Sequence, residues 1–417
     1  MTNFKHPIAA LLVLPLSFLI CPAASAQGSS IQAEQPFGCK GYPRTNLDRS
    51  VTVCQLREFK SLPSSDSVKL RAHPPAGSGS GSSINIGTFD TYTTPPRQLR
   101  AQGENRTTVD LKAYVYATAS DEAAANATAA EVVIHTADGD FYATRPQPSD
   151  PTAGIISIRG PNTPAWSASF AASVPHETDV TALGSSGNVQ AQDLAGTVSL
   201  ETISGDILAN RISGTLRARA NSGAIRVQDA SGKLEISTIS GKLDLLGLSG
   251  TVVASTNSGD VSAKELDGQQ SFEVISGNMV FEQVRGRSDF RSNSGDLQVL
   301  ALDGQSQFES ISGDVKLQGV SGTLEGSTNS GNVVLDLAGP AWIGAGAALT
   351  TISGDVSFLI PANYSAVFEF ETNSGTIRSD FSGKTYADDI VHQETLGRGG
   401  ATLKTTTNSG DITLSKK

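Results

Sequence analysis

Apolar and polar residues follow a strict nine-residue rhythm through the middle of this chain. Seventeen glycines stand nine residues apart from Gly187 to Gly331, and the second and fourth residues after each glycine are apolar in 30 of 34 cases. The third residue is apolar in only 4 of 17 cases. Because successive side chains of a strand point to opposite faces, each unit is predicted to be a short strand with one buried and one exposed face. Stacked copies of such a unit form a β-solenoid.

Two kinds of unit alternate, so the full repeat is 18 residues. In one kind, the residue before Ser-Gly switches strictly between isoleucine and asparagine: Ile203, Asn221, Ile239, Asn257, Ile275, Asn293, Ile311 and Asn329. A coil of 18 residues would stack Ile and Asn alternately in one column, whereas a coil of 36 residues would give each type its own ladder. We favour a right-handed β-solenoid of 18-residue coils, each made of two nine-residue strand-turn units, and keep the longer coil as the alternative.

The glycines of the Ser-Gly pairs are predicted to be structural turn residues. Glycine adopts positive φ without the steric cost that other residues meet, which suits a corner between two strands. This role is assigned to Gly187, Gly205, Gly223, Gly241, Gly259, Gly277, Gly295, Gly313 and Gly331.

Three phenylalanines, Phe272, Phe290 and Phe308, lie 18 residues apart on the predicted buried face. The residues two positions before them are polar: Gln270, Ser288 and Ser306. A densely packed interior cannot hold two large groups in one layer, so this pairing indicates core compensation rather than a ligand pocket. The three phenylalanines are therefore assigned to the core.

The regular pattern covers only part of the chain. Residues 27–105 contain a Gly/Ser run at 77–83 and Pro95-Pro96, which predict loops or linker. Residues 106–180 are predicted to be a small α/β region, with an Ala-rich helix near 120–130 that Ser120 can cap and that lies between strand patterns. The regular solenoid covers 181–340. In 341–417 the Ser-Gly motif recurs at longer spacings, which predicts irregular terminal coils and a cap.

The first 26 residues have the pattern of a secretory signal peptide. Lys5 precedes an apolar run from Ile8 to Ile20, and Ala24-Ser25-Ala26 predicts cleavage before Gln27. The run is too short to span a bilayer, and Ile20 before Cys21 disfavours a lipoprotein site. The expected location is the periplasm, the cell surface or the medium, with no transmembrane segment.

Cysteine content and charge narrow the chemistry. Outside the cytoplasm, Cys39 and Cys54 are expected to form a disulfide, because they lack nearby histidines and a Cys-x-x-Cys spacing. The formal net charge is −10 for the whole chain, and about −11 once Lys5 is removed. This acidity argues against a nucleic-acid partner, which would need clustered Lys and Arg.

The chain resembles the bacterial putative-adhesin family of exported β-strand-repeat proteins, whose function is unknown. The resemblance covers roughly Val109 onward. It rests on the run 174–180 before the first Ser-Gly-Asn-Val, on the alternating Ser-Gly-Asp/Asn units, and on the run 396–403 before the last Asn-Ser-Gly-Asp-Ile. It implies a β-helix-like solenoid on an exported protein. The family name implies adhesion, and no catalytic or binding residue comes with it.

Metal binding and catalysis find little support in the residues. A Ca²⁺ ladder would need an acidic residue after the turn glycine of every coil, and Ala224, Lys233 and Lys242 interrupt that pattern. The histidines form no metal-spaced pair, and the acidic pair Asp388/Asp389 is more typical of a solvated loop than of a polysaccharide-cleaving site. We expect no cofactor, no metal and no catalytic residue.

The sequence therefore favours a non-enzymatic exported module that presents a long polar face for surface or partner contacts. A cell-surface glycan and an envelope protein both remain candidate partners. The alternative is a periplasmic scaffold that binds a protein partner, and a carbohydrate-active β-helix enzyme is the third hypothesis.

Overall fold

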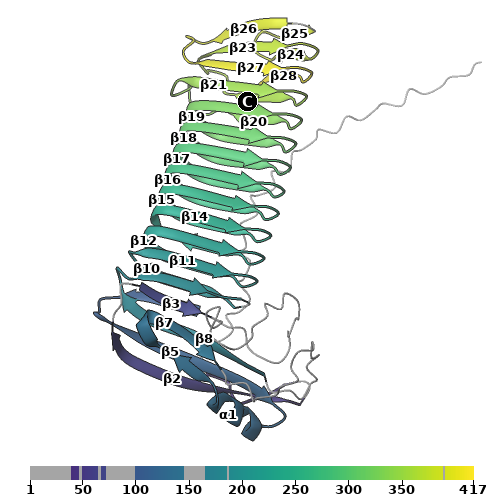
Figure 1. Ribbon diagram of the computed structural model, residues 1–417. Helices are drawn as coiled ribbons and strands as arrows, with labels where there is room; N and C mark the ends of the chain where they lie inside the picture. The colour runs from purple at the N-terminus through teal and green to yellow at the C-terminus, as the bar shows by residue number, and fades with distance from the viewer. Residues whose placement is uncertain are drawn as a thin grey trace, which may run out of the picture.

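Stacked β-coils build a long rod (Figure 1). The described residues between 39 and 183 close its N-terminal end; they span the predicted 27–105 and 106–180 segments, and we call them together the α/β region. The computed structural model describes residues 39–46, 49–63, 67–71, 99–144, 165–185, 187–387 and 390–417. The predicted signal peptide, the 77–83 and Pro95-Pro96 loops, His73 and Asp388/Asp389 lie outside these residues.

The regular coils are parallel and 18 residues long. Val261 pairs with Met279, and Phe272 pairs with Phe290. This register confirms the 18-residue coil and excludes the 36-residue one, so Ile and Asn alternate in a single column. Most coils contain one 14-residue strand that bends around a corner: β12 (Ile207–Ala220), β15 (Leu243–Thr256), β16 (Val261–Val274), β17 (Met279–Ser292), β18 (Leu297–Ser310) and β19 (Val315–Thr328). We call the two straight parts of a coil, on either side of this corner, its legs. In other coils the legs are separate strands: β10 (Val189–Leu194) with β11 (Thr197–Thr202), and β13 (Ile225–Gln228) with β14 (Ser231–Thr238).

The core runs along the inside of the rod between the two legs of each coil. In β16 the buried residues follow the predicted alternation on both legs and include the corner: Val261, Ala263, Leu266, Gln270, Phe272 and Val274. The rings of Phe272 and Phe290 stack with centroids 6.0 Å apart and planes 12° apart. Phe281 reaches both rings from the other leg, with centroid distances of 4.6 Å.

The polar partners of these phenylalanines are also buried. Gln270 Nε2 donates to the Arg285 carbonyl at 3.1 Å, and Ser288 Oγ donates to Gln270 Oε1 at 2.9 Å. One coil beyond Phe308 the equivalent position is Gly326, where a Cβ would lie 2.1 Å from the Phe308 ring. The chain therefore leaves space for each ring either within its own layer or in the next one.

The predicted reason for the Ser-Gly glycines is wrong. From Gly205 to Gly331 these glycines do not have positive φ. A Cβ on Gly259 would lie 1.8 Å from the carbonyl oxygen of Gly241 one coil below, so glycine is required by close stacking of the backbones. Positive φ occurs instead at the opposite corner, in the glycines from Gly214 to Gly322 and in a second column that starts at Asp193.

That second column mostly lacks glycine. Its members lie 18 residues apart and have φ between 50° and 65°: Asp193, Arg211, Asp229, Gly247, Glu265, Gln283, Ala301 and Gly319. A left-handed conformation costs a non-glycine residue of order 1 kcal/mol, and the ladders on either side hold it in place.

The α/β region continues the sheet rather than standing apart from it. Antiparallel strands β2 (Val51–Pro63), β5 (Thr108–Ala119) and β8 (Ala165–Pro175) lead to β4 (Leu99–Glu104), which pairs in parallel with β10. On the other leg, β3 (Ser67–Arg71) and β9 (Asp179–Leu183) lead to β11. Strands before residue 105 are thus hydrogen-bonded to strands after it. The division of the chain into two regions at that residue remains a prediction.

The remaining elements of this end are small. Helix α1 (Glu122–Ala130) packs against β5 and β2, and it is capped by Asp121, whose carboxylate accepts the Ala124 N–H at 2.9 Å. The predicted cap, Ser120, lies one residue earlier. The others are β1 (Arg44–Thr45), β6 (Val133–His135), the 3₁₀ turn η1 (Ala137–Gly139) and β7 (Asp140–Thr144).

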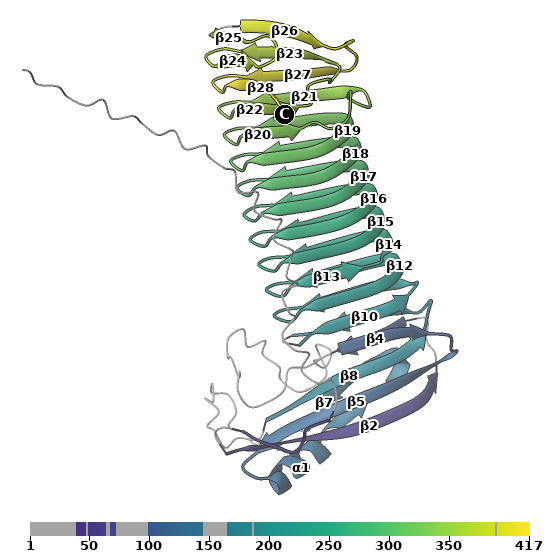
Figure 2. The ribbon, with the colours of Figure 1, turned by 180° about the vertical axis from the view of Figure 1, so that it is seen from behind.

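At the far end, the order of coils in space differs from their order in the chain. Strands β20 (Val333–Asp336), β21 (Gly346–Thr351) and β22 (Val356–Ile360) continue the rod. The next layer is β27 (Thr402–Thr407) with β28 (Ile412–Lys416). Above it lie β23 (Ala366–Thr372) and β24 (Thr376–Ser379), covered by antiparallel β26 (Ile390–Leu396) and β25 (Lys384–Ala387). Figure 2 shows this layering from behind.

Candidate binding face

The turns that join successive coils stack along one edge of the rod (Figure 1). A buried hydroxyl fixes most of them. Thr256 Oγ1 accepts the Gly259 N–H at 3.0 Å and donates to the Gly241 carbonyl at 3.5 Å. The same acceptor position, three residues before the glycine, is filled in other coils by Thr202, Thr238, Ser292, Ser310, Thr328, Thr372 and Thr407. The sequence carried this signal as Thr or Ser at a fixed distance from Ser-Gly, and our sequence reasoning missed it.

The acidic residues after the turn glycines link one coil to the next. Asp260 Oδ1 accepts the Asn278 N–H at 2.9 Å, and Asn278 Oδ1 accepts the Asp296 N–H at 3.1 Å. Asp296 and Asp314 continue the series toward Asn332. These side chains therefore act as backbone acceptors in a ladder. The described residues contain no group of three or more His, Cys, Asp or Glu arranged to hold a metal ion.

The most unusual surface feature is the column that precedes Ser-Gly. We call its regular part the Ile/Asn ladder: Ile203, Asn221, Ile239, Asn257, Ile275, Asn293, Ile311 and Asn329. All of these residues are exposed, and its isoleucines keep between 44% and 58% of their area in contact with solvent. Ile352 continues the column one coil further and is 52% exposed. This edge differs from the uniformly polar face expected from sequence, because it carries a row of apolar side chains.

A groove of about 250 Å³ follows the C-terminal half of the ladder, from Ile275 to Asn329. Ile275 and Ile311 line it two coils apart, with Asn293 between them. Glu273, Arg291 and Glu309 form an adjacent charged row on the second leg.

Two ion pairs hold the central charge of that row. The Arg291 guanidinium lies 2.7 Å from the Asp289 carboxylate and 3.5 Å from that of Glu309. The groove thus combines apolar walls with charged hydrogen-bonding groups, an arrangement suited to binding and lacking a nucleophile activated by a base.

Similar ion pairs run from coil to coil elsewhere on the surface. Arg211 contacts Asp193 at 2.6 Å, and Arg217 contacts Glu235 at 2.8 Å, each across one 18-residue step. Hydrogen bonding to Arg211 lowers the pKa of Asp193, and hydrogen bonding to Arg217 lowers the pKa of Glu235. The charged outer face is therefore organised along the rod axis.

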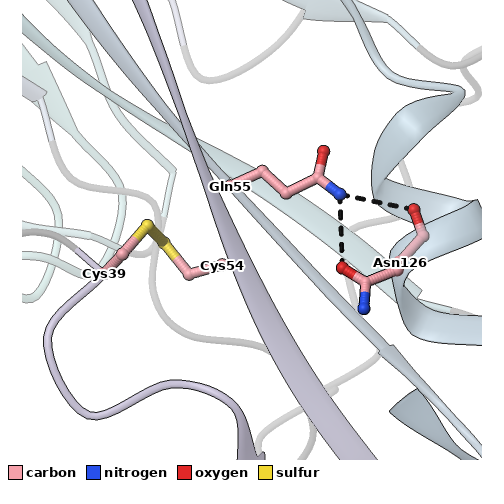
Figure 3. The surroundings of a disulfide bond; sticks show 4 residues. All are labelled: Cys39, Cys54, Gln55 and Asn126. Atoms are coloured by element: carbon pink, nitrogen blue, oxygen red, sulfur yellow. Dashed lines mark hydrogen bonds between the residues drawn. A yellow bond between two sulfur atoms is a disulfide. The ribbon is translucent and has the colours of Figure 1, made fainter. Parts of the chain in front are cut away.

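The predicted disulfide lies far from this groove, at the N-terminal end. Cys39 is bonded to Cys54 on β2, at a sequence separation of 15 (Figure 3). Next to it, Gln55 Nε2 donates to the side-chain oxygen of Asn126 at 3.3 Å and so connects β2 to α1. This disulfide therefore lies in the α/β region and is not part of the edge along which the turns stack, which we call the turn edge.

Other histidine and aromatic side chains make contacts within the fold. His176 Nδ1 lies 2.6 Å from the Asp193 carbonyl oxygen, and Trp342 Nε1 donates to the Gly322 carbonyl at 3.0 Å. Tyr364 is buried, and burial raises the pKa of its hydroxyl to about 12. In the cap, the Tyr386 ring contacts the His392 ring at 4.2 Å. No helix among the described residues is both long and apolar enough to cross a membrane.

Comparison with known proteins gives one family. A family model described as Toastrack DUF4097 matches residues 98–271, 155–310 and 251–415. No curated protein matches. Among solved structures, a putative cell adhesion protein from Clostridium sporogenes aligns over 87% of this chain and 100% of its own, at 8% identity and a TM-score of 0.16. A TM-score of that size supports no inference about shared fold or function.

Proposed function

Since the chain belongs to the Toastrack DUF4097 family, we propose that it is a non-enzymatic exported rod that uses its turn edge to hold a surface or a partner. The observation that carries this proposal is the Ile/Asn ladder. Exposed apolar residues scattered singly are normal on soluble proteins, whereas here exposed isoleucines recur in every second coil of one edge, from Ile203 to Ile352.

The structural roles of the polar groups support a binding function over a catalytic one. The turn aspartates accept backbone N–H groups of the neighbouring coil, and His176 contacts a backbone carbonyl. These groups are used to hold the rod together. The ladder isoleucines have no such role. Their side chains are about half exposed, and coils with asparagine at this position make the same backbone hydrogen bonds as coils with isoleucine.

A substitution series tests the proposal without disturbing the fold. Ile239→Asn, Ile275→Asn and Ile311→Asn copy the residue already present in the neighbouring coils, so the triple variant is expected to fold normally. The matched control removes three exposed apolar residues outside the ladder: Val253→Ser, Val280→Gln and Leu300→Gln, which copy Ser271, Gln298 and Gln318.

Binding of each purified rod to intact cells of the source bacterium and to its isolated envelope is the measurement. The ladder variant is expected to lose roughly 100-fold in affinity, because burying each of the three half-exposed isoleucines contributes about 1 kcal/mol. The control should bind like the unmodified rod. Equal binding by all three proteins would contradict the proposal.

Cell fractionation and cross-linking in the periplasm separate the adhesive role from the periplasmic scaffold. An adhesive rod should be found by cell fractionation at the surface or in the medium, with an N-terminus at Gln27. A scaffold should remain in the periplasm and be cross-linked there to an envelope protein through its ladder.

A further inference from the structure

The Ile/Asn ladder has a period that any long partner must match. Parallel coils are about 4.8 Å apart, so its isoleucines recur every ~9.6 Å along the rod. A second copy of this chain has the same period over the whole length. We propose that two copies pair along their ladders in antiparallel orientation; this rests on the proposed binding function of that edge.

A two-fold axis midway between any two adjacent coils makes the two ladders complementary, because isoleucine and asparagine alternate from coil to coil. With the axis midway between the coils of Ile275 and Asn293, Ile275 faces Asn293 of the second copy. The same operation places Ile239 opposite Asn329 and Ile311 opposite Asn257. Ile239, Ile275 and Ile311 therefore each meet the shorter asparagine, so that side chains of the two rods interdigitate instead of colliding.

The charged row beside the ladder is also complementary about this axis. In this arrangement Glu273 of each copy faces Arg291 of the other, which gives two opposite-charge contacts at the centre of the interface. In a parallel pair, the charged row would instead face the turn serines, including Ser276 and Ser294. These hydroxyls already donate to backbone carbonyls of the preceding coil. The antiparallel pair therefore gains ion pairs that the parallel pair lacks.

The predicted contact is small. About this axis the regular ladders overlap from Ile239 to Asn329, which is five coil-to-coil steps or about 24 Å, and a strip three residues wide is about 10 Å across. The pair would bury about 500 Å² in total, whereas stable specific interfaces bury about 1,200–2,000 Å². The dimer is accordingly weak in solution. It strengthens where many rods are held on facing surfaces, because linked contacts add through avidity.

Sedimentation velocity across a concentration series tests self-association of the full chain, with Cys21→Ser to remove the unpaired thiol. We expect a reversible monomer–dimer equilibrium. In the variant with Ile275→Asn and Ile311→Asn, the dissociation constant should rise roughly 30-fold or more. The control with Val253→Ser and Val280→Gln should dimerise normally, and thermal melting checks that all of them are folded.

Cross-linking with a short bis-maleimide tests the orientation. Asn293→Cys in one copy lies one coil step from its counterpart along the axis, about 5 Å, whereas Asn221→Cys lies seven steps away, about 34 Å. Cross-linked dimers are expected from Asn293→Cys only. Equal cross-linking of both variants would show a parallel pair and overturn the proposal.

The outcomes also separate this inference from the proposed function. A chain that stays monomeric at every concentration overturns self-pairing. If such a monomer still binds envelopes or glycans through the ladder, the binding function stands with a different occupant. If it binds nothing through the ladder, both proposals fail.

Discussion

Replacing Gly259 with alanine should destabilise the rod far more than replacing Gly319 with alanine. A Cβ on Gly259 would lie 1.8 Å from the Gly241 carbonyl oxygen and 2.9 Å from Thr256 Oγ1. At Gly319 the nearest atoms are 3.8 Å away. Both glycines belong to columns with an 18-residue period, so the two substitutions add the same methyl group to equivalent architecture and differ in the space available.

The size of the stability loss follows from the backbone hydrogen bonds that must open between the two coils. Ordinary contact with a Cβ begins near 3.4 Å, so the two coils must separate locally by more than 1 Å. That movement breaks or weakens the Gly259 N–H bond to Thr256 and the Ser258 N–H bond to the Ile239 carbonyl. Two or three such bonds at ~0.5–1.5 kcal/mol each, with the strain of adjacent layers, give a loss of about 3–5 kcal/mol.

The control substitution places alanine in a backbone conformation that an alanine of the same column already adopts. Gly319 has φ of 65°, and Ala301 occupies the same column one coil earlier with φ of 62°. Alanine at position 319 should therefore cost about 1 kcal/mol, the price of a left-handed residue.

Urea unfolding of both variants, followed by circular dichroism and by hydrogen exchange, measures the difference. Hydrogen exchange is needed because a solenoid can open on one side of a weakened coil before the rest unfolds. If Gly259→Ala lost no more stability than Gly319→Ala, the close-stacking explanation of the Ser-Gly glycines would be refuted.

Three further predictions concern the bonds that hold the coils. Thr256→Val keeps the shape of the side chain but leaves the buried Gly259 N–H without its acceptor, so the free energy of unfolding should fall by about 1–3 kcal/mol, as measured in urea. Because hydrogen bonding to Arg211 depresses the pKa of Asp193, the stability from that pair is complete above its ordinary pKa of 3.8 and is lost as the pH falls through the depressed value. Asp193→Asn should therefore flatten the acid limb of a melting-temperature profile, and an unchanged slope would count against the pair. Reducing the Cys39–Cys54 disulfide should destabilise the α/β region by about 3 kcal/mol, and hydrogen exchange should show the loss in β2 while the regular coils stay protected.

The sequence was sufficient to predict the nine-residue strand-turn unit because its signal is repeated many times, whereas the choice between 18- and 36-residue coils needed the register of the structure. Inward positions such as Val261 and Phe272 follow the period of two within each leg, and the Ile/Asn alternation became a single column once the register was seen. The sequence pattern indicates which positions are buried, and each repeat gives the same indication again, so the prediction does not depend on any single unit.

Other features could not be predicted, for physical reasons. Glu265 and Gln283 adopt positive φ although neither residue type favours it, because hydrogen-bonded layers above and below impose the corner. Glycine, conversely, is required for different reasons at different corners: close backbone approach alone at Gly259, and positive φ together with close approach at Gly268. The exposure of Ile275 was likewise invisible, since a β-branched apolar residue beside a strand is usually a core residue.

The displaced layer at the far end makes assembly of the rod depend on the order of synthesis. Strands β23 and β24 lack their supporting partner when they are made, because β27 and β28 are encoded later and must fill the slot beneath them. The tip therefore cannot close strand by strand as the chain emerges. A product interrupted before residue 402 would keep unpaired strand edges at its tip, and such edges invite pairing with other chains. The late-filled slot thus makes an incomplete rod physically distinguishable from a finished one.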